Sequence, residues 1–179
     1  RGEKSITGWL PVIPLYVNLQ KDLTPHVADL LALGTMDRRL DKLPALFEVL
    51  IADEPSMLLD AEEDSLTTEE YARVKKAMPE FRRMCEKLAS FGIPETIHHD
   101  DFHDANIFVR DGKVIFTDWG ESAITHPFFT LIVMLRSVGN SLGDDFSSEL
   151  ERLRDMYLTQ WVSYAPLADL QSVMKLAQR

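Results

Sequence analysis

The polar residues able to carry out chemistry are concentrated in one stretch, from His98 to Gly120. Asp101 lies in a loop dense in imidazoles and carboxylates, Asn106 follows it closely, and Asp118 comes after an intervening apolar stretch. A carboxylate within hydrogen-bonding reach can accept the proton of an attacking hydroxyl group. Carboxylate and amide oxygens are also ligands that suit hard cations such as Mg²⁺. The three residues therefore predict a proton acceptor beside a magnesium ion.

A β-hairpin is the element expected to position these residues. The pair Asp111-Gly112 separates two short apolar segments, residues 107–110 and 113–117. Both central residues of a tight hairpin turn need positive φ, which Asp-Gly tolerates well. Asn106 then directly precedes the first strand of the hairpin, and Asp118 directly follows the second. We expect both side chains at the same end of the hairpin, close to the Asp101 loop.

The pattern of His99-x-Asp101, Asn106 and the Asp118-x-Gly120 that follows the hairpin resembles the catalytic core of kinases. His103 and the segment Thr-Asp-Trp-Gly are similar to the corresponding motifs of the aminoglycoside phosphotransferase family, whose relatives include choline and homoserine kinases. The resemblance implies phosphorylation of a substrate hydroxyl with ATP, assisted by Mg²⁺.

The same resemblance assigns roles to individual residues. Asp101 is expected to be the catalytic base, and Asn106 and Asp118 are expected to hold Mg²⁺ on the nucleotide phosphates. His99 joins this cofactor-binding set, chiefly as a residue that braces the loop backbone by hydrogen bonds. His103 occupies the place of a lysine in protein kinases, so it is expected either to approach the γ-phosphate as a protonated catalytic residue or to have a purely structural role.

Neighbouring residues have less defined roles. The family usually has Gly at the position of Asp100 and Pro-Gly at that of Asp104-Ala105, so the substrate class stays open. Our first expectation is an aminoglycoside or a similar cationic amino-sugar, which would make the enzyme an antibiotic-resistance factor. Glu121 is a further candidate for contact with substrate or with a second metal ion.

The remaining sequence is mainly helical. Apolar residues recur with helical spacing between Leu43 and Ile51, and residues 128–135 are apolar almost all round, as in a buried helix. Thr67-x-x-Glu70 is a capping box that opens a long helix ending near Gly92, with a break or kink at Pro79. The predicted fold class is mainly α with a small β-hairpin.

Two kinase elements are missing from the sequence. The eight glycines include no G-x-G-x-x-G loop, and no upstream strand carries a Val-Ala-x-Lys pattern. We therefore expect residues 9–179 to form the C-terminal lobe of a kinase-like fold, preceded by a linker or hinge remnant at residues 1–8. The N-terminal lobe would be an absent partner, and the fragment alone would be inactive.

Composition restricts the other partners. A net charge of −10 argues against nucleic-acid binding, and no apolar run approaches a membrane span. The single cysteine, Cys85, excludes an intrachain disulfide and favours the cytoplasm. Between Asp53 and Glu70 there are eight carboxylates and no Lys or Arg. This stretch is either a solvated loop or an acidic lip that recruits a polycationic substrate.

Two alternative functions remain from the sequence. One is a metal-dependent phosphohydrolase, because imidazoles and carboxylates alternate closely enough to imitate a metal cluster. Its candidate ligands are His98, His99, Asp100, Asp101 and His103. The other is a non-catalytic domain that keeps the kinase-like fold for protein binding.

Overall fold

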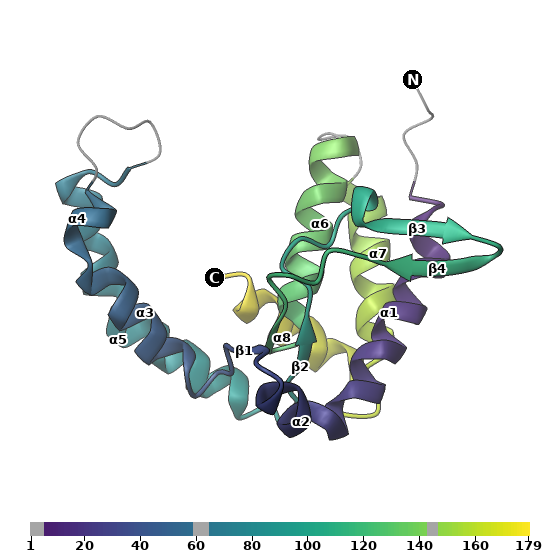
Figure 1. Ribbon diagram of the computed structural model, residues 1–179, viewed down its shortest axis with the longest axis horizontal. Helices are drawn as coiled ribbons and strands as arrows, with labels where there is room; N and C mark the ends of the chain where they lie inside the picture. The colour runs from purple at the N-terminus through teal and green to yellow at the C-terminus, as the bar shows by residue number, and fades with distance from the viewer. Residues whose placement is uncertain (1–5, 59–64, 143–146) are drawn as a thin grey trace.

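The computed structural model describes residues 6–58, 65–142 and 147–179, which form a helical body with a projecting arm (Figure 1). The described helices are α1 (Trp9–Leu23), α2 (Val27–Ala32), α3 (Leu43–Ala52), α4 (Glu54–Met57), α5 (Thr68–Ala89), α6 (Phe128–Leu142), α7 (Ser147–Thr159) and α8 (Leu167–Ala177). Short 3₁₀ turns are η1 (Thr24–His26) and η2 (Asp104–Asn106). The strands are β1 (Met36–Asp37), β2 (Thr96–His98), β3 (Ile107–Arg110), β4 (Lys113–Phe116) and β5 (Ala123–Thr125). The predicted class, mainly α with some β, is confirmed.

The predicted hairpin is present. Strands β3 and β4 pair antiparallel, with Ile107 opposite Phe116, and the turn residues Asp111 and Gly112 have φ of 51° and 72°. Strand β4 ends at Phe116, one residue earlier than predicted, although the Thr117 amide still donates to the carbonyl of the facing residue Asn106 at 3.0 Å. This bond closes the base of the hairpin.

A second, three-stranded sheet was not predicted. Its order is β1-β5-β2, with β5 parallel to β1 and antiparallel to β2. Strand β2 leads directly into the His98–Asp101 loop, and β5 follows shortly after Asp118. The sheet therefore fixes the loop and the exit of the hairpin against each other.

The hydrophobic core lies among α1, α6, α7 and α8. Its largest fully buried side chains include Trp161, Tyr16, Tyr157, Phe102 and Phe128. Phe102 comes from the polar loop itself, and its ring centroid lies 4.1 Å from that of Tyr16. One aromatic side chain thus anchors an otherwise polar loop in the core, with an aromatic-pair contribution of about 0.5–1.5 kcal/mol beyond its buried area.

Five polar side chains are buried inside this core, and we call them the buried polar network: Tyr16, Gln20, Thr96, Thr130 and Tyr157. Gln20 donates from Nε2 to the Ile97 carbonyl at 3.0 Å and accepts from the Tyr157 hydroxyl at Oε1. Thr96 donates to the Gln20 carbonyl, and Tyr16 pairs with Thr130 at 3.2 Å. The network ties α1 to β2, α6 and α7.

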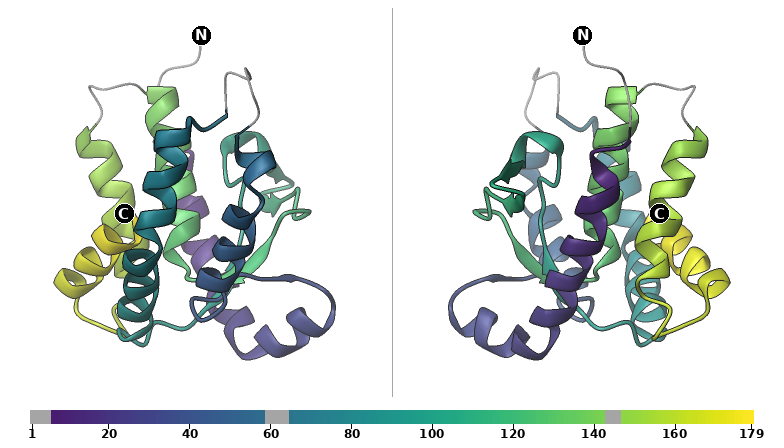
Figure 2. Two further views of the ribbon diagram at one scale, coloured as in Figure 1. Left: turned by 90° about the vertical axis from the view of Figure 1, so that its left-hand side faces the viewer. Right: turned by 90° about the vertical axis from the view of Figure 1, so that its right-hand side faces the viewer.

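The arm consists of α3 and α5 packed along each other (Figures 1 and 2). The Phe47 and Phe81 rings lie 5.1 Å apart between them. The capping box at Thr67 and Glu70 is confirmed, since Glu70 N–H donates to Thr67 Oγ1 and the Glu70 carboxylate accepts from the Thr67 amide. The predicted break or kink at Pro79 is not a break, because α5 continues through that residue. A kink there stays a prediction.

Two predicted segments are only partly described. Residues 1–5 of the predicted linker and residues 59–64 of the acidic stretch lie outside the described residues. Ile6 is buried in the core, so the end of the predicted linker packs against the body. Within the described ranges, every helix is too short or too polar to cross a membrane.

Candidate active site

Asp101 lies in the loop between β2 and η2, and its side chain is 58% exposed. Its Oδ2 accepts hydrogen bonds from Asn106 Nδ2 at 3.1 Å and from His103 Nε2 at 3.0 Å. Asn106 Nδ2 also donates to the Asp101 carbonyl at 2.9 Å. Because the amide nitrogen faces these two acceptors, Asn106 Oδ1 is the oxygen left for another partner.

The hydrogen bonds of His103 define its tautomer. The Ala105 amide donates to Nδ1 at 3.2 Å, so that nitrogen carries a lone pair and the proton is on Nε2. His103 therefore donates to Asp101 as a neutral imidazole in this arrangement. This contact agrees with the structural role considered for His103, and its approach to the γ-phosphate stays a prediction.

His99 is buried beneath the loop. Its side chain is 1% exposed, Nε2 donates to the Thr117 carbonyl at 2.8 Å, and Nδ1 accepts from the Asp101 amide at 3.3 Å. Both ring nitrogens are therefore used within the chain. The structure supports the bracing part of the prediction for His99 and gives it no exposed atom for direct contact with a cofactor.

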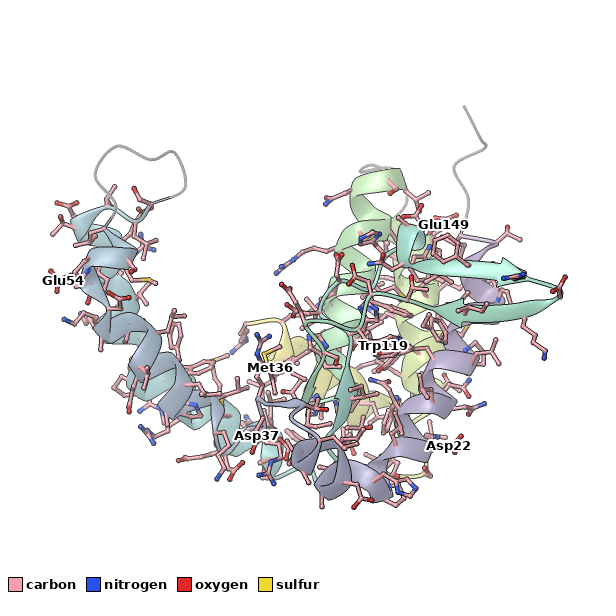
Figure 3. All side chains as sticks on the ribbon, in the orientation of Figure 1. Asp22, Met36, Asp37, Glu54, Trp119 and Glu149 are labelled. Atoms are coloured by element: carbon pink, nitrogen blue, oxygen red, sulfur yellow. The ribbon has the colours of Figure 1, made fainter. Side chains whose placement is uncertain are left out.

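Asp118 lies just after the hairpin and has a strained backbone conformation. Its φ is 62°, in the left-handed region, which Asp and Asn tolerate better than most residues. The preceding Thr117 holds this position from both sides, through its bonds to Asn106 and His99. Trp119 marks the place where the hairpin joins the body (Figure 3), and its ring lies 4.8 Å from that of His99.

Four carboxylates line one cleft of about 410 Å³, which we call the carboxylate cleft: Asp100, Asp101, Asp118 and Glu121. The hairpin and the loop thus bring Asp101 and Asp118 into one cleft, and Asn106 is hydrogen-bonded to Asp101. The donor set is all oxygen, which fits Mg²⁺.

The described residues contain no group of three or more His, Cys, Asp or Glu side chains already spaced to hold a metal ion. Mg²⁺ commonly binds through one or two carboxylates and completes its shell with water and substrate phosphates. The cleft therefore suits a magnesium ion that arrives with a phosphate ligand better than an all-protein metal cage.

The histidines of the alternative hydrolase do not form such a cage. His98 bonds to Thr130 through Nδ1 at 2.8 Å and to Asp100 through Nε2 at 3.0 Å. Burial lowers the pKa of His98, so the imidazole is neutral at pH 7. With His99 and His103 also bonded within the chain, no observation favours the hydrolase.

A directed chain of hydrogen bonds reaches the cleft from the core. The carboxylate of Asp100 can only accept, so neutral His98 donates to it from Nε2 and accepts at Nδ1 from the Thr130 hydroxyl. Thr130 Oγ1 is then the acceptor for Tyr16. The His99 amide donates to both Tyr16 and Thr130, at 3.1 and 3.2 Å.

Sequence reasoning missed Tyr16 and Thr130 as supports of the site. Each lies within an apolar helical stretch, where a single hydroxyl gives no local signal. Only the packing of α1 against α6 and β2 brings them to the loop, and that packing depends on contacts between residues far apart in the chain.

Comparison with known proteins gives one match. A family model described as "Phosphotransferase enzyme family" matches residues 5–170. No curated protein and no solved structure matches the chain.

Proposed function

The chain belongs to the phosphotransferase enzyme family, and from that premise we propose that it is the C-terminal lobe of an ATP-dependent enzyme that phosphorylates a small-molecule hydroxyl. One observation carries the proposal. Asp101 and Asp118 share the carboxylate cleft, and Asn106 is hydrogen-bonded to Asp101. This is the constellation that phosphoryl transfer needs, namely a base beside oxygen ligands for Mg²⁺.

In the proposed reaction, the acceptor oxygen attacks the γ-phosphorus of ATP. The new O–P bond forms, the bond from phosphorus to the β,γ-bridging oxygen breaks, and ADP leaves. The acceptor proton passes to the Asp101 carboxylate. Hydrogen bonds from His103 and Asn106 hold that carboxylate in one orientation, and the side chain is exposed enough for a substrate to reach it. A positioned base of this kind contributes about 10²- to 10⁴-fold in rate.

Asn106 Oδ1 and the Asp118 carboxylate would hold Mg²⁺, and when bound the ion neutralises charge on the nucleotide phosphates. His99 supports Asp118 indirectly, because its bond to the Thr117 carbonyl fixes the backbone just before that residue. In this proposal His99 and His103 are positioning residues, and neither touches the reacting atoms.

We further propose that a separate N-terminal lobe covers the phosphates. Among the described residues the sheets have three and two strands, which are too small to be a kinase N-terminal lobe. The proposed lobe would supply the glycine-rich loop and the lysine that phosphoryl transfer requires. We expect the 179-residue chain alone to show no turnover.

The test is Asp101→Asn in the full-length gene product, with ATP, Mg²⁺ and a panel of alcohols that includes kanamycin. We expect acceptor-dependent ADP formation by the wild type and a fall in kcat of about 10²- to 10⁴-fold in the variant. Asp111→Asn is the matched control, because it makes the same change at the exposed hairpin turn, where Asn also tolerates positive φ.

Retention of kcat within threefold in Asp101→Asn would contradict the proposed base. The absence of acceptor-dependent ADP formation in the wild type, across the panel, would instead favour a non-catalytic role for the fold.

A further inference from the structure

A second pocket, of about 290 Å³, adjoins the carboxylate cleft, and we call it the apolar pocket. It lies where the arm meets the body: Leu43 begins α3, whereas Phe129, Ile132 and Val133 belong to α6. In Figure 3 the labelled Met36 and Asp37, just before the lining residue Arg38, lie at this junction. The volume is at the lower end of the roughly 300–1,000 Å³ typical of ligand sites.

The two cavities share one wall residue, Asp100. The next residue along the chain is Asp101, whose carboxylate faces the carboxylate cleft. His98 fixes Asp100 by the 3.0 Å bond from Nε2, and Arg38 approaches it to 3.8 Å. Asp100 therefore lies between the apolar pocket and the proposed base.

The walls of the apolar pocket decide what kind of molecule fits it. Leu43, Phe129, Ile132 and Val133 offer neither charge nor hydrogen bonds, and burying apolar surface against them gains about 25 cal/mol per Å². Asp100, the carboxylate in this lining, already accepts from His98 and lies 3.8 Å from Arg38. An amino-sugar would therefore replace few of the hydrogen bonds to water that its hydroxyl and ammonium groups lose, which is costly. These walls favour an aliphatic or aromatic body over a polycationic one.

One polar group in the lining has no partner. Thr125 is 1% exposed, and its Oγ1 forms no hydrogen bond in the part of the chain that the structure describes. A buried hydroxyl without a partner is unfavourable, and rotation about χ1 moves a threonine hydroxyl between staggered positions. A polar atom at the inner end of an occupant can supply the missing hydrogen bond.

We propose that the apolar pocket binds the body of the phosphate acceptor, and that this acceptor is an alcohol with an apolar body and one polar atom for Thr125. Its reacting hydroxyl extends past Asp100 into the carboxylate cleft. The inference rests on the proposed phosphotransfer, and it replaces our expectation of an aminoglycoside with a different substrate class.

The experiment is titration of the ¹⁵N-labelled 179-residue chain, without nucleotide, using two probes. Tyrosol, 4-(2-hydroxyethyl)phenol, has an apolar ring with a phenol at one end and an alcohol at the other, whereas 2-phenylethanol lacks the phenol. We expect tyrosol to shift the amide signals of Thr125, Phe129 and Ile132 saturably. We expect 2-phenylethanol to bind at the same place more weakly.

Two variants separate the pocket walls from the hydroxyl. Val133→Trp fills the pocket and should weaken tyrosol binding at least tenfold, whereas Val49→Trp, at an exposed position on α3, should change it less than twofold. Thr125→Val keeps the side-chain shape and should weaken tyrosol about threefold to tenfold while leaving 2-phenylethanol unchanged. Because Thr125→Val is nearly isosteric, it tests the proposal even if Val133→Trp does not fold.

Two outcomes would overturn the proposal. One is kanamycin shifting the same amides at lower concentration than tyrosol, which would restore the polycationic class. The other is the absence of saturable shifts with either alcohol. Since the titration contains no nucleotide, a failure of phosphotransfer in the Asp101→Asn experiment would not change its result, and the two proposals can fail separately.

Discussion

The carboxylate cleft and the buried polar network both lie against the loop that carries Asp101, but they satisfy their polar groups differently. In the network, Gln20 and Tyr16 are wholly buried and are bonded to neighbouring backbone or hydroxyl groups. In the cleft, four carboxylates face one space. The buried polar network is neutral, and its hydrogen bonds are formed within the described chain. The carboxylate cleft carries excess negative charge.

This difference separates groups that hold the fold from groups that, under the proposed function, bind a ligand. A satisfied buried hydrogen bond contributes about 0.5–1.5 kcal/mol to stability, and its loss leaves a partner unpaired. Under the proposed function, the carboxylates of the cleft accept the substrate proton and hold the magnesium ion. Substitutions in the network should therefore change stability, and those in the cleft should change chemistry.

The largest expected effect comes from the cleft. Asp118→Asn keeps the left-handed backbone accessible but removes a proposed magnesium ligand, so kcat of the full-length gene product should fall at least about 100-fold. The free energy of unfolding, as measured by urea denaturation, should stay about the same. Glu121→Gln, which removes a charge from the same cleft but not at the hairpin exit, should cost less than tenfold. A loss of stability in Asp118→Asn with an unchanged kcat would show that Asp118 serves the fold and not the chemistry.

His126 is an exception among the buried polar residues, because its Nε2 has no partner in the described chain. Burial lowers the pKa of His126 from 6.5 to about 3. Below pH 6.5 the unfolded chain binds a proton that the folded chain rejects, so stability should fall as the pH drops toward 3. At about 1.4 kcal/mol per pKa unit, the maximal loss is about 5 kcal/mol.

His126→Asn should remove most of this acid sensitivity while keeping an acceptor for the Phe128 amide. Urea denaturation at pH 7, 5 and 4 measures the difference from the wild type. The exposed His26→Asn is the control and should follow the wild-type slope. Parallel pH profiles for wild type and His126→Asn would show that this histidine does not control acid stability.

Within the network, Gln20→Leu should lower stability by about 1–3 kcal/mol, because the Ile97 carbonyl loses its donor and the Tyr157 hydroxyl loses one of its two acceptors. The melting temperature should fall by roughly 2–4 °C per kcal/mol. The kcat of the folded fraction should change less than twofold. Gln171→Leu, on the partly buried α8 surface, is the control and should cost less. A large loss of kcat without loss of stability would place Gln20 in the chemistry.

Tyr16 links the two regions, since its hydroxyl accepts from the His99 amide and pairs with Thr130. Tyr16→Phe should cost about 1 kcal/mol of stability and lower kcat a few-fold, because the loop before Asp101 loses one anchor. The KM for ATP should not change. Tyr164→Phe, at a more exposed position, should alter neither kcat nor stability. An increase in KM alone would point to nucleotide contact instead.

The sequence allowed the hairpin to be predicted almost to the residue, because turn chemistry is local: only Asp111-Gly112 had to adopt positive φ. The convergence of Asp101 with Asn106 followed from the same local geometry and is observed, as is the shared cleft of Asp101 and Asp118. The catalytic and magnesium-binding roles of these residues remain predictions.

The three-stranded sheet and the apolar pocket could not be predicted in this way. Strands β1, β2 and β5 have two or three residues each, too few to show a period, and they pair across distant parts of the chain. The pocket draws Leu43 and Val133 from helices whose own patterns indicate only burial. Periodicity shows that a side chain faces inward, but not which space it lines.

The apolar pocket is lined partly by the arm, and this has a consequence for how the substrate specificity could evolve. Leu43 begins α3, the first helix of the arm, whereas Asp101 and Asp118 belong to the loop and hairpin. Under the proposed function, natural variants can change the orientation or the side chains of the arm and thereby accept a different substrate. The residues that carry out phosphoryl transfer would stay the same. The arm is thus the part of the molecule in which a lineage can diversify.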